Sequence, residues 1–496
     1  MINIAIVKRL LPKLYVVCGL GAVLGVLMMV FVWSHTALHD LDIWLHLKTG
    51  QLIFENKAFL YSDPFSFTSA LEENKNLHPF RENFILKQYW LGQVIFYLVY
   101  EHTGATGIIL LRALLLTMTL VLVLWRLRRW DVSFPLCFIF SFTLLTIIGR
   151  SIGERPVLFT IFFTAVIFFI LEDFRNKRDK RIFLLLPLMV LWANLHGGFI
   201  LGVVIIAIFM IGEGIKIIFR KAEYTRHKII LFYTATALAI VFSYINPTGW
   251  DAFIIAFSGK YKLFTAGIQE YQSPIFYYRT KIASVDYGYI ALTVILLLVI
   301  ILKNRKVDLT HAILVSGLFC ASIFAIRFLV FYSVIATMIL GKEADTFLRR
   351  LLAAKISERT NSRLSAVLIC ACLVSSILFA IGMVVSKDIR FGVATGYSVP
   401  ESAVNFIEKN KLQGNVLNDF GYGGYMSWRL YPWKKTFIDT RALNLTVMYE
   451  YGWIMSAVKS LSNKELAPDK MPLWERLLNN YDINIIFLSI FDIFGQ

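Results

Sequence analysis

Residues 182–219 read IFLLLPLMVLWANLHGGFILGVVIIAIFMIGEGIKIIF. The stretch is strongly apolar and is interrupted near its middle by a polar break, from Asn194 to Gly198. A helix needs about 20 apolar residues to cross the hydrocarbon core of a bilayer. The stretch therefore predicts two membrane helices, over 182–193 and 198–219. Irregular backbone at membrane depth is tolerated where it is buried in protein or lines a wet cavity.

Similar apolar runs extend over most of the chain on both sides of this stretch. They lie at 14–33, 106–124, 133–149, 156–171, 229–245, 286–302, 309–325, 328–340 and 364–385. With 57% apolar and only 17% charged residues, the chain is too apolar for a water-soluble protein. The fold class that follows is a polytopic α-helical membrane protein with about eleven transmembrane helices.

The net charge of +17 follows this topology rather than indicating nucleic-acid binding. Lys and Arg gather in alternate connections, as they do on the cytoplasmic side of membrane proteins. This pattern predicts a multi-pass protein of the cell (inner) membrane, with a cytoplasmic N-terminus and an outer C-terminal part. The first apolar run is interpreted as an uncleaved signal anchor. All five cysteines lie in apolar runs, where they act as small hydrophobic residues.

Two domains are expected. Residues 1–385 form the transmembrane domain, whose large first outer loop, 34–105, contains interfacial helices, among them the aromatic stretch 88–101. Residues 386–496 form an extracytoplasmic α/β domain, because strand candidates at 415–418, 435–439 and 483–488 are separated by helical patterns.

The strongest candidate for chemistry is the acidic cluster that follows the first apolar run. Asp40, Asp42 and His46 lie where a membrane helix should emerge, and Asp42 and His46 share one helical face. A carboxylate at this boundary can act as a general base, and two can hold a divalent cation such as Mg²⁺ or Mn²⁺. The alternative is a pair of solvated acids, one of which caps the helix.

Three further groups could contribute to the same cavity. Glu154 and Arg155 stand between two predicted helices, where Arg155 could pair with a phosphate and Glu154 could complete a metal site. An ordinary charged turn explains them equally well. Asn194 and His196 could line the cavity, or they could simply form a hairpin. Arg327 could bind a lipid phosphate or extend to the headgroups. In the C-terminal part, mutual pairing is the preferred interpretation of Asp439 and Arg441.

Four motifs together resemble a group of poorly characterised bacterial polytopic proteins related to the GT-C superfamily of membrane glycosyltransferases. They are DLDIWLH at 40–46 with Gly50, SDPFSFT at 62–68, WANLHGG at 192–198 and GGY at 423–425. That superfamily includes protein mannosyltransferases, the aminoarabinose transferase of lipid A and oligosaccharyltransferase catalytic subunits. The resemblance implies a sugar donor linked to polyprenyl phosphate or diphosphate and an acidic residue in the first outer loop.

Many of these enzymes have Asp-Glu in that loop, followed by a small residue seven positions on. Asp42 and Thr49 fit this spacing, but Ile43 stands in place of the glutamate, so Asp40 or Asp63 would have to supply any second carboxylate. The expected activity is inverting sugar transfer to an outer glycan, lipid or protein, with Asp42 as base or metal ligand. A flippase or transporter of lipid-linked material, or a GT-C-like scaffold without catalysis, stays open.

Overall fold

The structure is a computed structural model. It describes residues 37–70, 79–150, 153–176, 180–219, 224–257, 269–276, 287–302, 308–353, 392–393, 399–460 and 472–489, and isolated positions at 25 and between 367 and 385. The predicted first and last membrane helices therefore lie outside the described residues, apart from those isolated positions.

Every other predicted membrane run coincides with a helix, because long apolar stretches without internal breaks favour one. These helices are α4 (Trp90–Arg129), α5 (Phe134–Arg150), α6 (Val157–Asn176), α7 (Leu185–Leu195), α8 (Phe199–Ile218), α9 (Arg226–Phe242), α13 (Tyr287–Leu302), α14 (Leu309–Phe324) and α15 (Leu329–Ala353). The predicted break between α7 and α8 is confirmed, since His196 has an extended backbone there.

Several of these helices are long and apolar enough to cross a membrane, which indicates a multi-pass membrane protein. Among the described residues, the qualifying helical stretches are Glu82–Arg129, Val157–Asn176 and Phe199–Ile218; Phe134–Gly149 and Leu309–Phe324 are shorter. The predicted total of about eleven spans is not confirmed. The predicted interfacial stretch 88–101 is helical from Trp90 onward: it forms the first segment of α4, and non-helical backbone at Gly104 (φ 63°, ψ −158°) separates it from the long apolar segment that follows.

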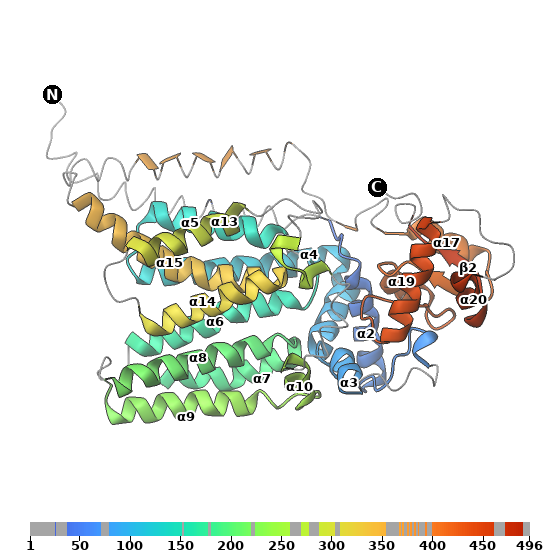
Figure 1. Ribbon diagram of the computed structural model, residues 1–496, viewed down its shortest axis with the longest axis horizontal. Coiled ribbons are helices and arrows are strands. Elements are labelled where there is room, and N and C mark those ends of the chain that lie inside the picture. The colour runs from blue at the N-terminus through green and yellow to red at the C-terminus, as the bar shows by residue number, and fades with distance from the viewer. Residues whose placement is uncertain are drawn as a thin grey trace.

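The long helices lie side by side in a bundle, and α2 (Asp42–Asn56) and α3 (Pro79–Lys87) lie between one end of it and the C-terminal elements (Figure 1). The other end is joined by ion pairs. Arg175 of α6 contacts Glu213 of α8 (Nε to Oε1, 3.1 Å), and Lys216 of α8 contacts Asp308 before α14 (Nζ to Oδ2, 3.0 Å). Arg175 and Lys216 thus lie at the end of the bundle opposite α2.

The C-terminal part combines helices with a two-stranded parallel sheet, in agreement with the predicted α/β character. Strand β1 (Asn415–Asn418) pairs with β2 (Ile483–Phe487). The helices are α17 (Glu401–Lys409), α18 (Gly423–Leu430), α19 (Leu445–Ser460) and α20 (Leu473–Asn480). The third predicted strand, 435–439, is not in this sheet. Thr436 instead forms a bridge with Ser66 of the first outer loop, where Phe67 N donates to the Thr436 carbonyl at 3.0 Å.

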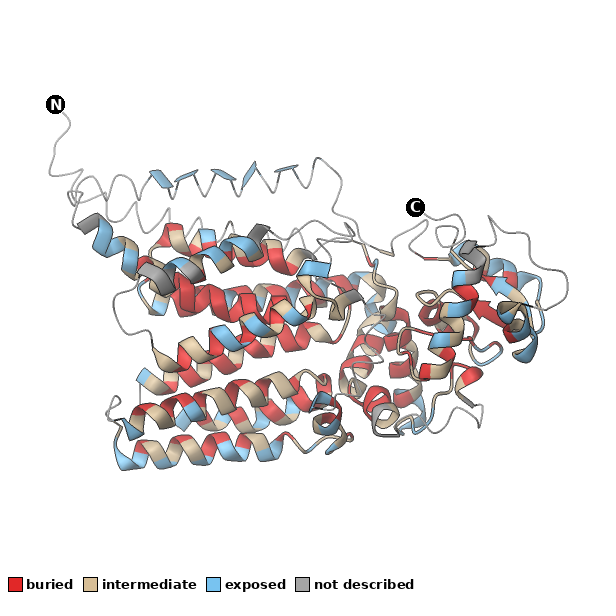
Figure 2. Ribbon diagram, in the orientation of Figure 1, coloured by how far each residue is buried: buried red, intermediate tan, exposed pale blue. Residues whose placement is uncertain are grey.

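Buried residues are found in both the helix bundle and the C-terminal part (Figure 2), and one apolar cluster extends from the first into the second. Val404, Val416 and Tyr425 belong to the same apolar cluster as Trp44 of α2 and the long helices. The cluster is continuous because α2 packs closely against α4 on one side and α18 on the other. A Cβ on Gly50 would overlap the backbone carbonyl of Gln93, and one on Gly424 would lie 3.1 Å from the Leu41 carbonyl oxygen. The first outer loop and the C-terminal part therefore pack as one cap on the bundle.

Candidate functional site

Asp40, Asp42 and Arg155 meet where the cap joins the bundle. Asp40 precedes α2, Asp42 is its first residue, and Arg155 precedes α6. Arg155 Nε donates to Asp40 Oδ2 at 2.5 Å, and its Nη1 lies 3.1 Å from Asp42 Oδ2. Asp40 Oδ1 also accepts from the Asp42 backbone N–H at 3.0 Å. Asp40 thus has a different partner for each carboxylate oxygen: one accepts from the first backbone N–H of α2, and the other pairs with Arg155.

A second, fully buried ion pair holds Asp40 in place. The side chains of Glu154 and Arg112 pair, both with 0% of their side-chain surface exposed. Glu154 Oε2 accepts from the Asp40 backbone N–H at 3.0 Å. Glu154 therefore holds the backbone of Asp40. Arg112, which the sequence analysis overlooked, had a detectable signal: an arginine inside an apolar run is costly without a partner.

A further carboxylate lies between two arginines at the same end of the bundle. Glu270, in the single turn η4 (Gln269–Tyr271), has Oε2 3.6 Å from Arg155 Nη1 and Oε1 3.5 Å from Arg327 Nη1. Arg327 lies in η5 (Ile326–Phe328), and its guanidinium covers the Tyr271 ring with 4.3 Å to the centroid. The structure thus brings both predicted phosphate-binding arginines to one acidic side chain that the sequence analysis did not identify.

His46 and His196 both contact the ring of Tyr89. Both imidazole centroids are 5.2 Å from that of Tyr89. His46 Nδ1 accepts from Gln93 at 3.1 Å, and His196 Nδ1 accepts from the Gly198 N–H at 2.8 Å. Burial lowers the pKa of each imidazole to about 3, aided by Arg155 at His46 and by Arg327 at His196. Both rings are therefore neutral at pH 7.

Asn194 has a structural environment. Its amide nitrogen donates to the carbonyls of Val190 (2.8 Å) and Ile245 (2.7 Å), while its oxygen accepts from Trp90 Nε1 at 2.8 Å. Because both ends of the amide have protein partners, Asn194 joins α7 to the end of α9 and the start of α4.

Asp63 lies apart from Asp40 and instead anchors the C-terminal part to the first outer loop. Arg441 Nη2 bonds to Asp63 Oδ1 and to Asp439 Oδ2, each at 2.5 Å. The side chains of Asp63 and Asp439 are only 0% and 3% exposed. Burial alone would raise the pKa of Asp63, but Arg441 and hydrogen bonds from Ser66 and Phe65 outweigh it and lower the pKa. The predicted pairing of Asp439 with Arg441 is confirmed.

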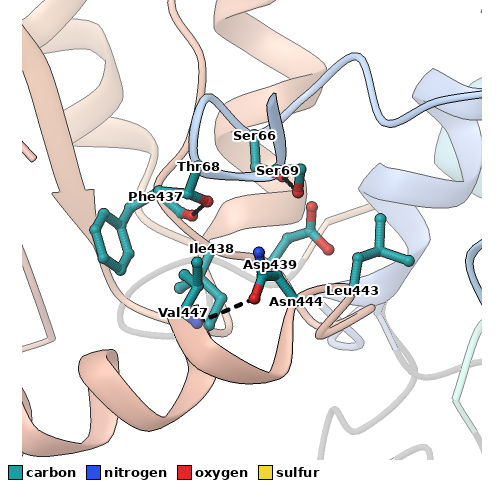
Figure 3. Close-up of a pocket in the computed structure, with 9 residues that line it drawn as sticks. All are labelled: Ser66, Thr68, Ser69, Phe437, Ile438, Asp439, Leu443, Asn444 and Val447. Carbon is teal, nitrogen blue, oxygen red and sulfur yellow. Dashed lines mark hydrogen bonds between the residues drawn. The ribbon is translucent and has the colours of Figure 1, made fainter. Parts of the chain in front are cut away.

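Figure 3 shows the small pocket beside this anchor, between the first outer loop and the C-terminal part. It is lined by Ser66, Thr68, Ser69, Phe437, Ile438, Asp439, Leu443, Asn444 and Val447. Thr68 Oγ1 donates to the Phe437 carbonyl at 2.5 Å, and Asn444 Oδ1 accepts from the Val447 N–H at 3.3 Å. The first of these bonds joins the two segments that form the walls of the pocket, and the second lies within the C-terminal segment.

Thr440 lies between Asp439 and Arg441 in the chain, and its side chain hydrogen-bonds to Asp42. Burial raises the pKa of Asp42 to about 6. Arg155 and the Thr440 hydrogen bond act to lower this pKa, whereas the negative charges of Asp40 and Glu270 act to raise it. A carboxyl with such a pKa is mostly ionised at pH 7 and still basic enough to accept a proton. The sequence analysis missed Thr440 because it lies about 400 residues from Asp42 in the chain.

The donor set of Asp40 and Asp42 does not fit a divalent cation. Both Asp40 oxygens are occupied, by a guanidinium and by a backbone amide, and Arg155 already supplies positive charge beside both carboxylates. Among the residues that the structure describes, no three His, Cys, Asp or Glu side chains are grouped to hold a metal.

The apolar bundle and its cap, with a carboxylate and arginines at their junction, define a multi-pass helical membrane protein with its polar site at one end. No family model and no curated protein matches the sequence. Among solved structures, the fold is similar to that of the archaeal oligosaccharyltransferase AglB from Archaeoglobus fulgidus, solved in complex with an inhibitory peptide and a dolichol-phosphate. The TM-score is 0.54 at 10% identity, over 97% of this chain and 69% of AglB.

Proposed function

We propose that the protein is an inverting membrane glycosyltransferase that moves a sugar from a polyprenyl-phosphate-linked donor to an extracytoplasmic acceptor. The observation that carries the proposal is the combination of Asp42, whose pKa is about 6, with Arg155 at 3.1 Å. One group can take a proton while the other binds an anion. The AglB complex contains a dolichol-phosphate, which supports a lipid phosphate as the anionic part of the donor.

In this proposal, Asp42 takes the proton of the acceptor hydroxyl or amine as that atom attacks the anomeric carbon of the sugar. The bond between the anomeric carbon and the phosphate oxygen breaks, and the configuration inverts. The lipid phosphate leaves with one additional negative charge, which Arg155 and Arg327 stabilise. His46 and His196 are poor candidates for the base, because a pKa of about 3 makes an imidazole a weak proton acceptor.

The test is transfer of radiolabelled sugar from a panel of polyprenyl-phosphate donors, in membranes that contain the protein or lack it. Label should move to an acceptor only when the protein is present, and a chelator should not stop it. Loss of transfer in the chelator would reinstate the predicted Mg²⁺ or Mn²⁺. If no donor supports transfer while lipid moves between the leaflets of proteoliposomes, the transporter alternative replaces this proposal.

The rate should depend on pH through Asp42. As the pH falls through about 6, the carboxylate gains a proton and stops acting as a base, so kcat/KM should fall tenfold per pH unit on the acid side. Thr440→Val removes a hydrogen bond that favours the charged form and should move this limb to higher pH. Thr446→Val is the matched control in the same part of the chain. An acid limb that is identical in all three proteins would contradict the assignment.

Gly153 tests the contact between Asp40 and Arg155. A Cβ at this position would overlap Asp40 Oδ2. Gly153→Ala should therefore displace the carboxylate and reduce kcat/KM for transfer by about tenfold to a hundredfold, because small displacements in a site are costly. The matched control is Gly452→Ala in α19, where a Cβ would meet nothing within 4 Å. Equal activity of the two variants would show that the position of Asp40 is unimportant.

A further inference from the structure

The side chain of Glu270 lies where two guanidinium groups converge. Its two carboxylate oxygens are each directed to a different arginine, 3.6 Å from Arg155 Nη1 and 3.5 Å from Arg327 Nη1. A phosphate group has the same ability to present separate oxygens to separate guanidinium groups. The contact is therefore of the kind that a bound phosphate would make.

We propose that Glu270 occupies the phosphate position of the donor site, and that the phosphate of a polyprenyl-linked ligand binds by displacing this side chain. The inference rests on the proposed function for the identity of the ligand. It assigns Glu270 as a residue that sets the affinity for the anion, and not as a group that takes part in the chemical step.

The charges around the site favour such an exchange. With Asp40, Asp42, Arg155, Glu270 and Arg327 all ionised, their formal charges leave a single negative charge, and without Glu270 they balance. A phosphodiester carries one negative charge, as the Glu270 carboxylate does. Replacing the carboxylate by the ligand therefore leaves the charge of the site unchanged. Adding the phosphate while Glu270 stayed in place would put two like charges between the same arginines.

The surrounding structure lets the side chain move while its backbone stays. The Ile326 N–H donates to the Gln272 carbonyl at 3.0 Å, and Arg327 covers Tyr271, so η4 is held to η5 on both sides of the contact. The Glu270 side chain is 42% exposed. Ion pairs at this exposure and distance contribute little, so rotation of the side chain into solvent costs little.

Glu270→Gln tests this proposal by binding alone, in purified full-length protein in detergent. The probes are polyprenyl phosphate, the corresponding polyprenol without phosphate, and inorganic phosphate. Loss of two weak ion pairs should tighten polyprenyl phosphate binding by about threefold to tenfold. Affinity for the polyprenol should not change. If Glu270→Gln also binds inorganic phosphate more tightly, the site recognises the phosphate group without the lipid, which supports the proposal.

Two variants complete the comparison. Glu401→Gln removes an exposed acidic charge from α17 and should leave all affinities unchanged, which excludes a general effect of net charge. Arg327→Gln should weaken polyprenyl phosphate binding, because it removes one of the two anion partners. Unchanged or weaker polyprenyl phosphate binding by Glu270→Gln would overturn the proposal.

The outcome is separable from that of the proposed function. If Glu270→Gln binds polyprenyl phosphate more tightly but the protein never transfers sugar, the proposed anion site stands and the proposed transferase activity is rejected. Sugar transfer by the wild type, together with a Glu270→Gln variant that loses kcat without gaining affinity, would retain the transferase. It would overturn the inference by placing Glu270 in the reaction.

Discussion

Replacement of Asp42 by Asn should lower sugar transfer by about a hundredfold to ten-thousandfold, the usual contribution of a general base. The substitution keeps the size of the side chain and removes its ability to accept a proton at neutral pH. Arg155 retains Asp40 at 2.5 Å and Glu270 at 3.6 Å, so the fold and the anion site should persist. The measurement is the initial rate of transfer in membranes, with protein amount and melting temperature recorded alongside.

Asp131→Asn is the matched control for this variant. Asp131 is exposed, lies just after α4 at the end of the bundle opposite the site, and has φ 57°, a conformation that Asn tolerates well. Its transfer rate should equal that of the wild type. If Asp42→Asn also transfers sugar at the wild-type rate, Asp42 is not the base. If neither the wild type nor any variant transfers sugar, the scaffold alternative gains support.

Replacement of Arg441 by Met should have the largest effect on stability. It would leave Asp63 and Asp439, which are 0% and 3% exposed, without their shared cation. Removing one partner of a buried ion pair typically costs about 3–5 kcal/mol. The same change releases Thr440 from Asp42, which should raise the pKa of Asp42. The transfer rate of the protein that remains folded should therefore fall at a higher pH than in the wild type. Thermal unfolding in detergent and the pH dependence of transfer measure the two effects separately.

The explanation through uncompensated charge can be tested within the same three residues. Adding Asp63→Asn and Asp439→Asn to Arg441→Met removes the buried negative charges and should recover most of the lost stability. Arg429→Met is the control, because Arg429 pairs at 2.9 Å with Glu408, whose side chain is 50% exposed, and should cost no more than about 1 kcal/mol. A triple variant as unstable as Arg441→Met would mean that packing, and not charge, is lost.

Local features of this protein were predictable from its sequence because they depend on neighbouring residues. The helix α2, the break at His196 and the helices of the bundle follow from apolar runs and helical spacing, which act over a few turns. The pairing of Asp439 with Arg441 also follows from proximity in the chain. The prediction that 435–439 joins the C-terminal sheet was wrong because strand character is local, whereas the choice of partner is not. Thr436 of this segment pairs with Ser66 of the first outer loop.

The composition of the candidate site was decided by tertiary structure. The sequence by itself determined a polytopic helical membrane protein and a set of charged residues at the ends of its helices. Only packing determined that Asp42 meets Arg155, that Thr440 reaches Asp42 from the C-terminal part, and that Glu270 lies between two arginines. Burial then raised the pKa of Asp42 and kept both imidazoles neutral. Such effects depend on distance in space and loss of solvent, which spacing along a chain does not encode.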